Sequence, residues 1–295
     1  MMDLKAANLY LGLGGAYCDL CDNSKDSCHN PAVVKEGFEI TRTVSSLHDL
    51  FGELGEEDGS VTRRPEDYDS CRGLTNEPIP NHEVISVPVL HALLRCFDHW
   101  MKIAVRLRAR VYEWSEAETS HYLRFLKKAK QEIQSKLEDV LGERWDFPDG
   151  TGKGGTSTTG NTARRILHHG GREIVLEMLP ERFKPAMTQI GQYLSVILRL
   201  FSSSRRINVN QYKKMCTNLY LLYLESFPRE TTQQSKQSNK RHKHCDATWI
   251  SVPPSLHKLL AHSWELIEMN GEQGLKCLDE SGLEANNKVL RSIRL

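Results

Sequence analysis

The sequence predicts a mainly α-helical fold for most of its 295 residues. Apolar side chains recur at helical spacing from residue 86 onward, and residues that favour helix ends interrupt this pattern. The chain shows no regular alternation of strands and helices of the kind that builds a large parallel sheet. We therefore expect packed helices, with one short strand at residues 36–43 as an exception.

Composition divides the chain into four segments. Residues 1–85 are rich in turn residues and contain closely spaced cysteines, so they predict an irregular segment with a cysteine knuckle. Residues 86–227 carry most of the helical patterns. Residues 228–247 are polar and partly basic, which is typical of a linker. Residues 248–295 return to helical patterns and form the last segment.

Local signals mark the ends of the first two long helices. Ser86 and Pro88 suit the start of the first helix. Ser115 and Glu118 form a capping box at the start of the second, and Gly142 can end it. Further helices are expected near residues 161–168, 172–179, 186–201, 209–226, 254–268 and 282–294.

Charge and hydropathy argue against a strongly basic nucleic-acid-binding protein and against a membrane protein. The chain has 39 Lys and Arg against 38 Asp and Glu, so any surface for nucleic acid must be a local patch. No apolar run approaches the roughly 18 residues that span a bilayer, and no secretory leader is expected. We expect a cytosolic or nuclear protein without a membrane partner, in which thiols stay reduced.

Two pairs of residues have the spacing of metal ligands. Cys18 and Cys21 are separated by two residues, and His257 and His262 by four, which are both spacings found in zinc sites. The alternatives are a redox pair of cysteines and two ordinary helix histidines. On an ideal helix the histidines would be turned by about 140° from each other, although the prolines just before His257 place a helix start nearby. Together, the pairs predict one zinc ion that joins the two ends of the sequence.

A glycine-rich loop at residues 150–155 resembles a phosphate-binding loop. It lacks the preceding buried strand of a dinucleotide site, and Gly154 replaces the Ser or Thr of a nucleotide-binding P-loop. We therefore expect no nucleotide. Asn161, Arg164 and Arg165 follow the loop and favour a contact with a DNA backbone, the alternative being a solvated loop.

Glu284, Lys288 and Arg291 share one face of an expected helix. This spacing fits a surface ion pair, and it also fits a metal-binding carboxylate followed by cations that face phosphates. A short basic run at residues 240–244 fits either a solvated segment or a contact with nucleic acid.

These motifs occur in the order found in one family. The chain resembles the catalytic subunit of the V(D)J recombinase and its relatives, the Transib transposases. The resemblance is carried by residues 16–24, 89–100, 154–167, 256–268 and 279–294, and its most specific strings are GNTARR at 160–165 and the Glu284 segment.

The resemblance implies an RNase H-like core whose two aspartates and one glutamate hold Mg²⁺ or Mn²⁺. A helical insertion, stapled by zinc, separates the second aspartate from the glutamate in this family. Cys18, Cys21, His257 and His262 match the zinc ligands, and Glu284 matches the catalytic, cation-binding glutamate. The chain would then be a zinc-stapled helical insertion with the C-terminal part of an RNase H-like DDE recombinase.

The resemblance also implies DNA as partner, a nuclear location, a homodimer and a second recombinase subunit. The expected DNA-binding residues are Asn161, Arg164, Arg165, Lys288 and Arg291. The family's two catalytic aspartates have no match, so most of the RNase H core is missing and the chain alone is expected to be inactive. Whether it is an enzyme is left open, and the alternative is a non-catalytic zinc-binding module that binds DNA or protein.

Overall fold

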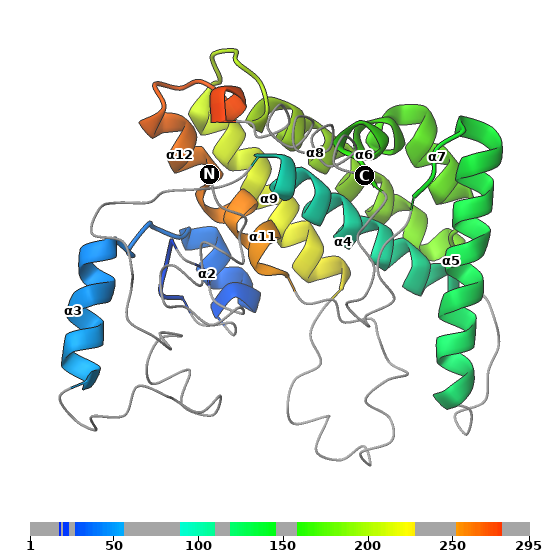
Figure 1. The fold of residues 1–295 in the computed structure, drawn as a ribbon, viewed down its shortest axis with the longest axis horizontal. Helices are drawn as coiled ribbons and strands as arrows, with labels where there is room; N and C mark the ends of the chain where they lie inside the picture. Colours follow the sequence, from blue (N-terminus) through cyan, green and yellow to red (C-terminus); the bar gives the residue numbers. More distant parts are fainter. Residues whose placement is uncertain are drawn as a thin grey trace, which may run out of the picture. The chain divides into compact units, whose positions relative to one another are not determined.

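The regular elements of the structure, a computed structural model, are helices (Figure 1). No strand forms among the residues that the structure describes, and one isolated antiparallel bridge joins Arg206 to Gln273. The prediction of a mainly α fold is therefore confirmed for this part of the chain. The described residues are 18, 20–23, 27–55, 89–109, 119–145, 158–227 and 252–278.

The first elements differ from the sequence prediction. The 3₁₀ turn η1 (Ser27–His29) leads into α2 (Pro31–Glu36), and α3 (Val44–Gly55) follows. Residues 37–43 form no strand, so the expectation of a strand at 36–43 is wrong. Asn30 caps α2 with its side chain, and Pro31 suits the first helical position, which favours a helix here.

The two long helices α4 (Val89–Ala109) and α5 (Thr119–Leu141) agree with the predicted pair. The backbone of Gly142 has a φ of 66°, and its amide bonds the carbonyl of Glu138 at 2.9 Å, so glycine ends α5 as expected. The capping box proposed at residues 115–118 lies outside the described residues.

Shorter helices follow in nearly the predicted places. They are α6 (Gly160–Leu167), α7 (His169–Glu177), the 3₁₀ turn η3 (Glu181–Phe183), α8 (Lys184–Phe201) and α9 (Val209–Ser226). The helix expected at 209–226 matches both ends of α9.

The last described helical segment has three parts. It begins as α11 (Pro254–His257), widens into the π turn η5 (Lys258–His262), and continues as α12 (Ser263–Met269) before the 3₁₀ turn η6 (Leu275–Leu278). The helix expected at 282–294 lies outside the described residues.

The chain divides into two compact units. Unit one contains the described residues within Met1–Ala92, Leu200–Leu221 and Val252–Leu295, and unit two those within Leu93–Arg199 and Leu222–Ser251. In unit one, the amide of Val252 donates to the ring of His29 at 3.2 Å, which joins early and late parts of the sequence.

Each unit has its own apolar core. In unit two, Phe97, Trp100 and Ile190 are fully buried, and Gly191 leaves the space that the Trp100 ring occupies. In unit one, the buried residues include Leu219 and Leu256, which come from distant parts of the sequence. In the part of the chain that is described, no helix is both long and apolar enough to cross a membrane.

Candidate metal centre

A tight turn near the start of the chain presents Cys18 and Cys21. The carbonyl of Leu20 accepts hydrogen bonds from the amides of Thr41 and Arg42 at 2.9 and 3.1 Å. The guanidinium of Arg42 donates to the carbonyl of Cys18 at 2.8 Å. Hydrogen bonds from the segment that follows α2 therefore stabilise the backbone around the two cysteines, and both cysteines are buried.

The histidines are presented by the π turn. Hydrogen bonds in a π turn join residues five apart, so His257 and His262 stand one turn apart on the same face. Their ring centroids lie 5.3 Å apart with the ring planes at 80°. This widened turn removes the angular separation that an ideal helix would impose on the pair.

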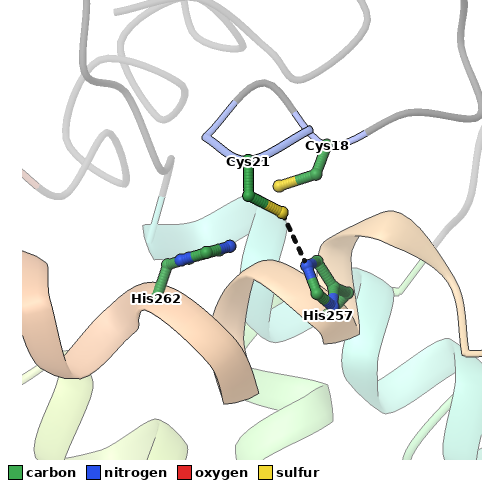
Figure 2. Close-up of side chains that lie close together, drawn as sticks. All are labelled: Cys18, Cys21, His257 and His262. Atoms are coloured by element: carbon green, nitrogen blue, oxygen red, sulfur yellow. Dashed lines mark hydrogen bonds between the residues drawn. The ribbon is translucent and has the colours of Figure 1, made fainter. Parts of the chain in front are cut away.

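Figure 2 shows the four side chains pointing toward one another. Their donor atoms all lie within 4.8 Å of one another, and all four residues are buried: Cys18, Cys21, His257 and His262. The Cys21 Sγ lies 3.4 Å from the Nε2 of His257. Donor atoms of a tetrahedral zinc site lie roughly 3–4 Å apart, given its bond lengths, so the cluster can hold a metal such as zinc.

The outer nitrogen of each imidazole has a protein partner. The Nδ1 of His257 lies 2.9 Å from the hydroxyl of Tyr220, and the Nδ1 of His262 lies 3.1 Å from a carboxylate oxygen of Glu265. The Nε2 of His262 is buried and has no hydrogen-bond partner in the described structure. A metal ion in the cluster would satisfy this atom, so the residues present fit the ion that their spacing predicted.

The thiols and the buried imidazole influence one another's protonation. Burial and the neighbouring Cys21 raise the pKa of Cys18. The hydrogen bond with Cys18 and the charge of Arg42 help to lower the pKa of Cys21 to about 7. Although burial alone lowers it, contacts with Cys18 and Glu265 raise the pKa of His262 to about 9. Metal binding needs both thiolates and neutral imidazoles, so it would release protons from this cluster.

The residues predicted to bind DNA are only partly described. Asn161 and Arg164 are exposed on α6, in unit two. Arg165 is also exposed but forms an ion pair with the nearly buried carboxylate of Glu143. Glu284, Lys288, Arg291 and the glycine-rich loop at 150–155 lie outside the described residues.

The residues that surround the four candidate ligands were not predicted from the sequence. Glu265 could have been found, because it stands three residues after His262 on an expected helix and so faces the same side. Tyr220 and Phe38 could not, since their approach to the histidines depends on how distant segments pack.

A search with models of known protein families finds no match to this chain, and no curated protein shows significant similarity to it. Function is therefore inferred from the geometry of its own residues and from the resemblance described above.

Proposed function

We propose that the chain binds one structural zinc ion through Cys18, Cys21, His257 and His262. The observation that carries this proposal is the meeting of four buried donor atoms from two ends of the sequence. Two thiolates and two imidazoles form a soft donor set that favours zinc over magnesium or calcium. Four protein ligands complete a tetrahedron and leave no position for substrate, so the ion has a structural role.

The larger function that we propose is that of a part of a DNA recombinase or transposase of the V(D)J recombinase and Transib type. The support is the resemblance in four segments, the last of which combines residues 256–268 and 279–294, and the order of the four proposed metal ligands within it. In this proposal the chain is nuclear, binds DNA, and belongs to an RNase H-like enzyme. Glu284 would be its third catalytic carboxylate.

Mg²⁺ or Mn²⁺ bound at such carboxylates would activate the attacking oxygen and stabilise the leaving oxygen. The structural zinc would act at a distance by fixing the helices that lead to Glu284 in sequence. The residues of this chain proposed to bind DNA phosphates are Asn161, Arg164, Arg165, Lys288 and Arg291.

A second candidate is a zinc-binding interaction module without catalysis. The favouring observation is that the four-ligand cluster is complete without any catalytic carboxylate. Mapping the 5′ end of the transcript separates the candidates. An in-frame upstream extension with two acidic residues in matching segments supports the recombinase, and a transcript that begins at Met1 supports the module.

Metal content of the purified chain tests the zinc site. Elemental analysis should find one zinc per chain, lost in Cys18→Ser and in His262→Ala. Cys96→Ser is the matched control, because Cys96 is a buried thiol in unit two, outside the cluster. Absence of zinc from the wild-type chain, or its retention in His262→Ala, would overturn the site.

A further inference from the structure

Each imidazole of the candidate metal cluster has a polar partner at Nδ1, the ring nitrogen that faces away from the cluster. The Nδ1 of His262 meets the carboxylate of Glu265, and the Nδ1 of His257 meets the hydroxyl of Tyr220. The opposite nitrogen of each ring, Nε2, belongs to the cluster or lies buried at it. Each histidine therefore turns Nδ1 toward its partner and Nε2 toward the cluster, and the two partners are chemically different.

We propose that Glu265 and Tyr220 are positioning residues that hold the two imidazoles ready for the metal, with Nε2 as the ligand atom. This inference rests on the proposed zinc site and adds which residues outside the four ligands set its affinity. Metal-bound histidines commonly donate their other N–H to a carboxylate or another acceptor, which fixes the tautomer and makes the ligand more basic.

Glu265 acts locally. It stands on α12, three residues after His262, so the helix itself places its carboxylate beside the ring. Its side chain is 16% exposed and that of His262 is fully buried, so the interaction is largely shielded from water. A carboxylate can only accept here, and this requires the hydrogen on Nδ1 and leaves the lone pair of Nε2 for a metal.

Tyr220 acts over a long distance in sequence. It lies on α9, 37 positions before His257 in the sequence. Its buried hydroxyl can accept the Nδ1 hydrogen of His257 in the same way. The partner on α9 therefore ties the metal cluster to a third part of unit one.

Phe38 restricts both rings further. Its ring packs edge-on against His257 at 4.8 Å and His262 at 6.4 Å between centroids, and stacks on Tyr220 at 5.9 Å. An imidazole that is held by a hydrogen bond and also packed against an aromatic ring has little freedom to turn. Less conformational freedom is therefore lost when the metal binds.

The test is the zinc affinity of the purified chain, measured by competition with a chromophoric chelator. We expect Glu265→Ala and Tyr220→Phe each to weaken zinc binding by about 10–100-fold. Glu265→Gln should recover most of the affinity, because its amide oxygen still accepts from Nδ1. The d–d absorption of the cobalt-substituted protein should keep a tetrahedral Cys and His signature in all variants.

Two matched controls separate positioning from general loss of structure. Glu268→Ala removes an exposed glutamate from the same helix. Tyr212→Phe removes a buried hydroxyl from α9 whose partner is Ser263, at 3.0 Å, instead of an imidazole. Both should bind zinc like the wild type.

The outcomes are distinguishable from those of the zinc proposal itself. If the wild-type chain binds no zinc, the proposed site fails. If the wild type binds zinc and Glu265→Ala and Tyr220→Phe bind it equally well, only the positioning role fails. An equal loss of affinity in Tyr212→Phe, or no recovery in Glu265→Gln, would also overturn that role.

Discussion

The imidazoles of His257 and His262 lie with centroids 5.3 Å apart because one π turn separates the two residues. Five steps of an α-helix would turn them by about 140° from each other. The wider turn closes over the same five residues and brings both rings to one face. A rare backbone feature therefore brings together the two histidines of the candidate metal cluster, in keeping with the tendency of π turns to occur where function requires them.

Metal removal should loosen the π turn and the cysteine turn together. A metal at about 100 times its Kd stabilises the folded state by about 2.7 kcal/mol. This slows the hydrogen exchange of amides that open together with the site by roughly a hundredfold. We expect chelation to accelerate hydrogen exchange in Lys258–His262 and at Leu20 by about this factor. Helix α5, in unit two, is the internal control. Unchanged exchange in the π turn after verified zinc loss would contradict this prediction.

Two adjacent glycines should respond oppositely to alanine. A Cβ at Gly171 would lie 2.6 Å from backbone atoms of Ile166, whereas a Cβ at Gly170 would have nothing within 4 Å. Backbone atoms cannot yield cheaply, so Gly171→Ala should destabilise the protein by about 1–3 kcal/mol or more. Gly170→Ala, within α7, should be neutral or stabilising by up to about 1 kcal/mol. Chemical denaturation of both variants checks this, and equal effects would show that the close approach is absent.

Acid should weaken the fold through His99. Burial, followed by the charges of Arg106 and Lys102, lowers the pKa of His99 to about 3 from its ordinary value of 6.5. The folded protein keeps this ring neutral while the unfolded chain binds a proton below about pH 6.5. The free energy of unfolding therefore shows no loss through His99 above pH 6.5. It falls as the pH drops from there toward 3, by up to about 1.4 kcal/mol per pH unit.

His99→Gln tests this dependence. The variant should lose stability less steeply than the wild type between pH 7 and 4, as measured by urea denaturation at a series of pH values. His168→Gln is the control, because the side chain of His168 is exposed and is therefore in contact with water in both the folded and the unfolded state. Parallel curves for the wild type and His99→Gln would show that the fold does not keep the His99 ring neutral.

The ion pair between Arg165 and Glu143 should limit DNA binding if α6 contacts phosphates as proposed. Arg164→Ala should weaken binding uniformly across sequences and reduce the slope of log affinity against log salt by about 0.9. Glu143→Gln should strengthen binding, because it leaves Arg165 free to meet a phosphate. Fluorescence anisotropy at several salt concentrations measures both. A Glu143→Gln variant that binds no better would show that Arg165 does not face the DNA.

The long helices were predictable because each signal is local. Apolar periodicity located α4 and both ends of α9, and Gly142 ended α5 through its positive φ. The meeting of Cys18 and Cys21 with His257 and His262 was predictable for another reason. Two cysteines separated by two residues and two histidines separated by four both have the spacing of zinc ligands. Each pair supplies half of a four-ligand site, so each pair predicts the other.

Other features could not be predicted from the sequence, because they depend on tertiary packing. The alternation at residues 36–43 resembles a strand, but no neighbouring strand is described, and the amides of Thr41 and Arg42 bond to Leu20 instead. The π turn has no sequence signature in Lys258–His262. The hydroxyl of Tyr220 meets His257 only after α9 and the late helices have packed.

The span of 236 residues between Cys21 and His257 also affects the order in which the protein can be made. A ribosome adds roughly 5–20 residues per second, so about 12–47 s pass between the two ligands. During that time His257 and His262 are not yet available to the newly made cysteines. The candidate metal cluster can therefore assemble only after nearly all of the described chain has been synthesised, and a nascent chain would carry the two thiols without these histidines until then.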